Sequence, residues 1–122
     1  MAGSGEFDLQ MSDADALMWT IEKDPMLRST ITAIALLDRA PDHDRLREVL
    51  LRGARLIPRL TQRVRAHSYS VAPPRWEDDP NFDIDWHLRH VAVPAPGGPR
   101  ELADLAAHLN AIPLDRSRPL WE

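Results

Sequence analysis

The sequence predicts an α+β two-layer sandwich, with a mixed sheet and with helices on one face of that sheet. Two observations lead to this fold class. Apolar residues recur at helical spacing in three stretches, near residues 12–23, 42–57 and 101–112. Shorter apolar or alternating stretches, bounded by prolines, glycines and aspartates, lie between these helices and are typical of strands. Because helices alternate with strands and no segment repeats, the helices are expected to form one layer on the sheet.

The first helix is expected to begin at Ser12, which can act as an N-cap with Asp15 three positions later, a variant of the capping box. The dipeptide Asp24-Pro25 should end it, because proline disfavours helical backbone in the residue before it. Residues 29–37 then begin with β-branched side chains and become apolar on both faces. This pattern predicts a central strand covered on both sides.

The second helix is predicted to be capped by Asp42 and to end near Leu56, because Pro58 lacks the N–H that a helix interior needs. Its apolar side chains fall on one stripe. That stripe comprises Leu46, Val49, Leu50, Gly53, Leu56, Ile57 and Leu60. Residues 62–69 alternate enough to predict a weak strand, which Pro73-Pro74 ends.

Five further segments are predicted in the second half of the chain. Residues 76–85 read as an acidic loop with aromatic anchors, and residues 86–93 as a poorly defined strand. A turn at 94–99 separates them from a helix over 101–112. Finally, Pro119-Leu120-Trp121 resembles the start of a strand that enters a core, since proline is tolerated at the first residue of a strand. Because a domain seldom ends by starting a buried strand, we expect the chain to be unfinished.

Composition narrows the class of protein. The chain has 122 residues, one domain's worth, and a formal net charge of -4, which argues against a nucleic-acid binder. It has no cysteine, which excludes disulfides and thiolate chemistry, and no apolar run approaches the roughly 20 residues of a membrane span. Residues 1–10 are expected to be a disordered remnant of an expression vector, and residues 11–122 an incomplete domain.

Two clusters of residues carry a resemblance to a known family. One is Trp76, Phe82, Asp83 and His87, and the other runs from Leu114-Asp115-Arg116 to Pro119-Leu120-Trp121. Together they resemble the N-terminal part of the bacterial wax ester synthase/diacylglycerol acyltransferase family. The resemblance covers essentially residues 11–122. It implies half of the chloramphenicol-acetyltransferase-like fold, which condensation domains share.

The resemblance also implies an activity. Members of the family transfer a fatty acyl group from acyl-CoA to a long-chain alcohol or diacylglycerol, so acyl-CoA is a substrate and no metal or redox cofactor is expected. In the family a His-His-x-x-x-Asp-Gly motif, one strand after Pro-Leu-Trp, carries the catalytic base. None of the five histidines here has a histidine neighbour or an aspartate four positions later. We therefore assign no catalytic residue and expect this chain to be inactive alone.

The candidate site residues follow from the same motifs. Pro119, Leu120 and Trp121 are expected to line the wall of the substrate channel. Trp121 could also be a core tryptophan that packs the sheet, and the two interpretations do not exclude each other. Asp115 could pair with Arg116 or Arg118 and hold this segment in place. The remaining motif residues are expected to have structural roles. They are Trp76, Phe82, Asp83 and His87.

The sequence gives little support to two possible metal sites. Asp79-x-Asn81-x-Asp83 mimics the start of a calcium loop, but Ile84 stands where glycine is required. A turn with local hydrogen bonds from aspartate side chains fits better. His87 and His90 are three positions apart, so on a strand they would point to opposite faces. No metal site is predicted.

Three alternatives remain open at this stage. The chain could be a non-catalytic half-fold that binds a lipid, or an oligomer-forming module that pairs through an open sheet edge. A condensation domain shares the implied fold but fits the first cluster less well. For the acyltransferase, the expected partners are the remainder of the polypeptide, acyl-CoA and an apolar alcohol or diacylglycerol. Its high arginine usage, with Lys23 the one lysine among 15 basic residues, indicates an actinobacterial source. We expect a cytoplasmic location, with possible peripheral contact with a membrane or lipid droplet.

Overall fold

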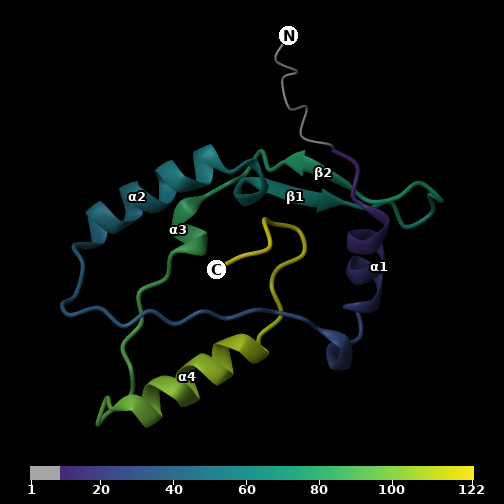
Figure 1. The fold of residues 1–122 in the computed structure, drawn as a ribbon. Coiled ribbons are helices and arrows are strands. Elements are labelled where there is room, and N and C mark those ends of the chain that lie inside the picture. Colours follow the sequence, from purple (N-terminus) through teal and green to yellow (C-terminus); the bar gives the residue numbers. More distant parts are fainter. Residues whose placement is uncertain (1–8) are drawn as a thin grey trace.

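The computed structural model describes residues 9–122, which form helices and a small two-stranded hairpin (Figure 1). Its α-helices are α1 (Asp13–Ile21), α2 (His43–Leu56), α3 (Ile84–His87) and α4 (Pro99–Ala111). Two 3-10 helices, η1 (Pro25–Leu27) and η2 (Pro58–Leu60), and two strands, β1 (Gln62–Arg65) and β2 (Arg75–Asp78), complete it. In Figure 1, α2 and the hairpin lie on one side of a long extended segment and α4 lies on the other.

Local capping explains where the long helices begin. The Ser12 hydroxyl accepts a hydrogen bond from the Asp15 N–H at 3.1 Å, and Asp42 Oδ1 accepts one from the Arg45 N–H at 2.8 Å. Both caps satisfy donors that have no partner inside the helix. The predicted helices at 12–23, 42–57 and 101–112 are therefore confirmed, with the last one beginning two residues earlier, at Pro99.

The sheet is smaller than expected. Among residues 9–122 it has two strands, β1 and β2, which pair antiparallel with Val64 opposite Trp76. Glu77 on β2 forms ion pairs with Arg63 and Arg65 on β1. The prediction of a mixed sheet is thus wrong for this part of the chain, and so is the loop expected to begin at Trp76. Cross-strand pairs of this kind join residues that are distant in the sequence.

Residues 29–37 also depart from the prediction. They run as an extended segment across the molecule, but no strand within residues 9–122 pairs with them. Their apolar side chains are exposed, with Ile31 93% and Leu36 81% accessible. The central strand expected here is therefore absent, because extended backbone becomes a strand only beside a partner that accepts and donates its hydrogen bonds.

Two further strand predictions are wrong. Residues 84–87 form a helical turn, because the Asp83 carboxylate accepts a hydrogen bond from the Asp85 N–H at 3.0 Å and caps it. Residues 88–93 have no regular structure, and Pro119-Leu120-Trp121 is not a strand.

Residues 1–8, where most of the predicted vector remnant falls, lie outside the described residues. Leu9 and Gln10 pair with β2: the Trp76 N–H donates to the Leu9 carbonyl at 2.7 Å.

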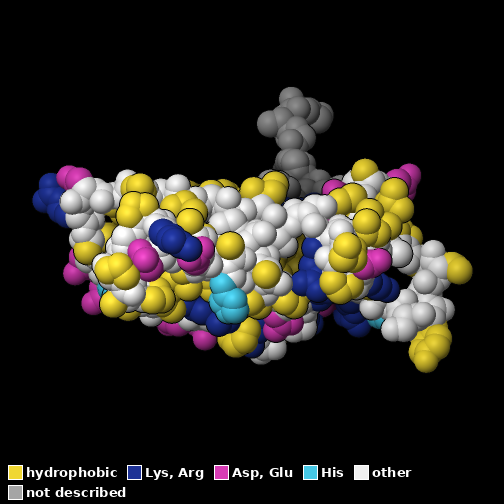
Figure 2. All heavy atoms as spheres, turned by 90° about the horizontal axis from the view of Figure 1, so that it is seen from below, with side chains coloured by type: hydrophobic (Ala, Val, Ile, Leu, Met, Phe, Trp, Pro, Cys, Tyr) yellow, Lys and Arg dark blue, Asp and Glu magenta, His cyan; other side chains and the backbone are white. Residues whose placement is uncertain are grey.

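The buried core is small, and residues of α2, α3 and β1 contribute to it. Its apolar members include Ala54, Val64 and Ile84, and His87 is buried with them. Figure 2, a view from below Figure 1, shows many hydrophobic side chains at the surface. No helix among residues 9–122 has both the length and the apolar character needed to cross a bilayer.

Candidate functional site

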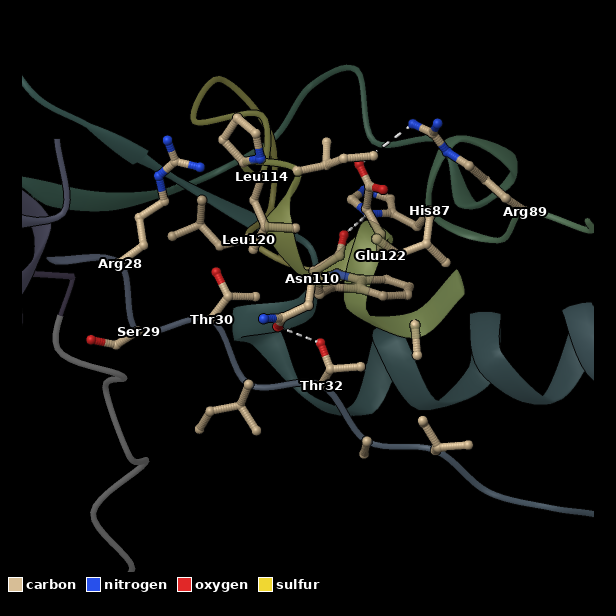
Figure 3. Close-up of a pocket in the computed structure, with 18 of the residues that line it drawn as sticks. Arg28, Ser29, Thr30, Thr32, His87, Arg89, Asn110, Leu114, Leu120 and Glu122 are labelled. Atoms are coloured by element: carbon tan, nitrogen blue, oxygen red, sulfur yellow. Dashed lines mark hydrogen bonds and ion pairs between the residues drawn. The ribbon is translucent and has the colours of Figure 1, made fainter. Parts of the chain in front are cut away.

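The candidate site is an apolar groove with a volume of about 930 Å³ (Figure 3). One wall is the extended segment, and the facing wall is the apolar stripe of α4. The C-terminal residues Leu120, Trp121 and Glu122 form the end of the groove together with residues 87–89 and 91. A hydrogen bond of 2.7 Å from the Thr32 hydroxyl to Asn110 Oδ1 joins the two walls. The α4 stripe in the groove comprises Leu102, Leu105, Ala106 and Leu109.

His87 lies at the end of this groove and is only 3% exposed. Its Nδ1 lies 2.6 Å from the carbonyl oxygen of Trp121. Because a carbonyl oxygen only accepts hydrogen bonds, Nδ1 is the donor in this contact. The imidazole stacks on the Phe82 ring at 5.4 Å and on the Trp121 ring at 4.3 Å. Nε2 is buried and has no hydrogen-bond partner among the described residues.

Trp121 is held at its side chain as well as its main chain. Its indole N–H donates to the carbonyl oxygen of Leu60, at the end of η2, at 2.8 Å. Its own backbone N–H donates to the carbonyl of Pro119 at 2.9 Å, and Pro119 is buried. The position of this end of the groove therefore depends on α3 and η2 together.

Arg89 and Arg118 connect the last residues of the chain to α3 and to the residues that follow it. Arg89 and Arg118 both lie over the ring of Trp86, with guanidinium carbons 5.0 and 4.2 Å from its centroid. Arg89 also forms an ion pair with Glu122 at 3.4 Å. Contacts between a guanidinium and an indole face are favourable because the ring face is electron-rich.

The turn before Pro119 is organised by Asp115. Its Oδ1 accepts hydrogen bonds from the hydroxyl of Ser117 at 2.7 Å and from the Ser117 N–H at 2.9 Å. These bonds, with Arg118 nearby, hold the pKa of the Asp115 carboxyl below its usual value. The predicted pairing of Asp115 is therefore confirmed with Arg118, at 3.5 Å.

Arg116 takes a different partner. Its guanidinium carbon lies 3.5 Å above the centroid of Trp19, and Nη2 donates to the Trp19 carbonyl oxygen. Burial lowers the pKa of this guanidinium, and the charge of Glu22 acts in the opposite direction. Arg116 thus connects the C-terminal turn to α1, and both Arg116 and Trp19 line the groove.

The structure brings together some of the predicted site residues and separates others. Phe82, His87 and Trp121 form one stacked cluster, and Leu120 lines the groove beside it. Asp83 contributes indirectly, by capping α3. Trp76 lies elsewhere, on β2, with the Arg59 guanidinium 4.6 Å from its ring centroid.

Sequence analysis missed several residues of the groove. Thr32 and Asn110 join its walls, and the Leu60 carbonyl receives the indole of Trp121. One signal was present: the apolar stripe of α4 and the apolar residues of 29–37 both need cover, so they could have been matched with each other. The contacts of Asn110 and Leu60 span 78 and 61 positions, and no local pattern announces them.

The groove offers apolar binding surface and few side chains that could act as an acid or a base. His87 is the only histidine among the described residues that lines it, and its Nε2 is covered. A general base must reach the proton that it removes. Asp79 forms the predicted turn, since its Oδ1 accepts from the Asn81 N–H at 2.9 Å. No group of three metal-ligating side chains occurs among residues 9–122.

Comparison with known proteins identifies the class. The model of the wax ester synthase/diacylglycerol acyltransferase catalytic domain matches residues 9–122, so the chain belongs to this family, as the two sequence clusters predicted.

Three relatives from Mycobacterium tuberculosis are similar to this chain. The putative diacylglycerol O-acyltransferase Rv2484c is 43% identical over 124 residues, which cover 99% of this chain and 25% of that protein. The probable diacylglycerol O-acyltransferase tgs3 is 36% identical over 115 residues, 93% of this chain and 42% of that protein. The probable diacylglycerol O-acyltransferase tgs1 is 40% identical over 93 residues, 75% of this chain and 20% of that protein. The chain thus spans less than half the length of each of these relatives. No solved structure matches it.

Proposed function

We propose that this chain is part of an O-acyltransferase that moves a fatty acyl group from acyl-CoA to diacylglycerol or to a long-chain alcohol. The products are triacylglycerol or a wax ester. The observation that carries the proposal is the apolar groove, which Leu120 and Trp121 close at one end. Family membership supports the same reaction, and the three relatives are named as diacylglycerol O-acyltransferases.

In this proposal the chain supplies binding surface and another part of the longer polypeptide supplies the base. The base removes the proton of the alcohol while its oxygen attacks the thioester carbonyl, after which the carbon–sulfur bond breaks and CoA leaves as the thiol. The covered Nε2 of His87 and the absence of a paired histidine motif support this division. Acyl-CoA is then a substrate, with no metal or redox cofactor.

The proposal extends to fold, partner and location. The helices and the extended segment would become the layers of half of a chloramphenicol-acetyltransferase-like domain once the rest of the polypeptide supplies strands beside residues 29–37. The exposed side chains of Ile31 and Leu36 support such a partner. The enzyme would work in the cytoplasm, with peripheral contact with a membrane or lipid droplet where its apolar substrates gather.

A chimera tests the proposal. The 122-residue chain replaces the matched segment of Rv2484c, and both the chimera and the chain alone are assayed for ester formation from palmitoyl-CoA with dioleoylglycerol or hexadecanol. We expect the chimera to be active and the chain alone to be inactive. Equal activity of the chain alone would show that the base lies within the 122 residues. A folded but inactive chimera beside an active Rv2484c would contradict the proposed reaction.

A second function is favoured by one observation. The exposed apolar face of residues 31–37 could bind a lipid or a second copy of the chain, which would make it a non-catalytic module. Sedimentation of the chain with phospholipid vesicles separates the two functions only together with the chimera assay: the non-catalytic module predicts vesicle binding by the chain and an inactive chimera.

A further inference from the structure

The buried ring of His87 has two nitrogens in different situations. Nδ1 lies 2.6 Å from the Trp121 carbonyl oxygen, while Nε2 is buried without a partner among the described residues. The ring is also stacked on Phe82 and Trp121. A general base must reach the proton that it removes, and Nε2 of His87 is buried.

We propose that His87 is a positioning residue. Its Nδ1–H holds the main chain of Trp121, and so fixes the wall that closes the groove, while Nε2 takes no part in proton transfer. The inference deepens the proposed function, on which it rests in treating that wall as part of the substrate channel.

Two independent contacts make this assignment specific. The 3-10 helix η2 holds the indole of Trp121 through the Leu60 carbonyl, and α3 holds the carbonyl of the same residue through His87. The first contact holds the side chain of Trp121, and the second holds its main chain.

Measuring the tautomer of His87 tests the inference without an activity assay. In the nitrogen-15 spectrum of the labelled 122-residue chain, we expect the protonated ring nitrogen of His87 to be Nδ1. His87→Asn identifies the signal by removing it. A His87 that carries its proton on Nε2 would overturn the proposal, whatever the variants below do.

Three variants then separate the two ring nitrogens. The amide nitrogen of asparagine is separated from Cβ by the same number of bonds as Nδ1 of histidine. The amide nitrogen of glutamine is separated from Cβ by the same number of bonds as Nε2. His87→Asn should keep the slow hydrogen exchange of the Trp121 indole N–H. His87→Gln, and His87→Phe, which keeps a stacking ring, should accelerate it roughly two- to tenfold, as expected for the loss of one hydrogen bond.

His90 supplies the matched control, because it is exposed and stacks on His43 at 5.8 Å, away from Trp121. His90→Gln should leave the indole exchange unchanged. If His87→Gln retains slow exchange and His87→Asn loses it, Nε2 is the working nitrogen and the proposal fails. Equal exchange in all variants also refutes it.

In the chimera, we expect His87→Asn to keep the activity and His87→Gln to lose it. An inactive parent chimera would contradict the proposed function, and the tautomer result would still stand.

Discussion

At the scale of single residues, the turn at Asp115 places the last segment of the groove. One carboxylate oxygen accepts two hydrogen bonds from Ser117, and the other lies 3.5 Å from the Arg118 guanidinium. Hydrogen bonds to a charged carboxylate are stronger than neutral ones. The turn is therefore more stable when Asp115 is ionised.

This arrangement predicts a dependence of stability on pH. The pKa of Asp115 is lowered in the folded chain from the ordinary value of 3.8, mainly by the Ser117 hydroxyl. Its stabilising contribution is thus fully present above pH 3.8 and is lost as the pH falls through the lower, folded value. The free energy of unfolding in urea, measured between pH 6 and pH 3, should fall less steeply for Asp115→Asn than for the parent. Asp104→Asn, on an exposed position of α4, is the control, and equal slopes in parent and Asp115→Asn would contradict the prediction.

At the scale of elements, α2 contains an internal glycine, Gly53, that the helix itself does not require. Gly53 lies in the helix interior, and a Cβ added there meets no atom within 4 Å. Glycine costs a helix roughly 0.5–1 kcal/mol relative to alanine because the unfolded chain loses more freedom.

We therefore expect Gly53→Ala to raise the free energy of unfolding of the 122-residue chain by about 0.5–1 kcal/mol, measured by urea denaturation. Gly98→Ala is the matched comparison. Its Cβ would lie 3.0 Å from Glu101 Oε2, which accepts the hydrogen bond that starts α4, so this change should not stabilise. A loss of stability in Gly53→Ala would show that α2 needs glycine at this position. A gain in the chain but a loss in the chimera would indicate that another part of the longer polypeptide packs there.

At the scale of the whole molecule, the chain buries few apolar side chains and exposes many. Ile31, Ile34 and Leu36 line or flank the groove and are 93, 56 and 81% exposed. Contiguous apolar surface of this kind marks a site of contact with another chain segment or a ligand. The extended backbone beside it adds hydrogen-bonding groups that a neighbouring strand can use.

This surface predicts concentration-dependent association of the isolated chain. Analytical ultracentrifugation should show oligomers that weaken in Ile31→Lys, because a charge on the groove wall opposes burial. Val71→Lys, at a fully exposed position in the loop between β1 and β2, should leave association unchanged. If the parent stays monomeric, or if both variants behave alike, the groove is not the associating surface.

The long helices and the family could be predicted from the sequence because their signals are local. Ser12 and Asp42 cap helices within three residues of themselves, and the Pro119-Leu120-Trp121 motif is contiguous. Alternation predicted a strand over residues 62–69, and β1 occupies residues 62–65. The second strand and the extended segment could not be predicted in the same way. Residues 75–78 form a strand because they face β1, and residues 29–37, which look more like a strand, have no partner among the described residues.

The same contrast holds within the site. The sequence determined which residue types were present at the groove: an aromatic cluster, a carboxylate turn and an apolar helix face. The tertiary structure decided that His87 meets Trp121 across 34 positions and that Trp121 meets Leu60 across 61. It also decided that Trp76 stays apart. Hydrogen bonds and stacking depend on distances in space, and chain closure over tens of residues leaves no mark in the local pattern from which those distances could be inferred.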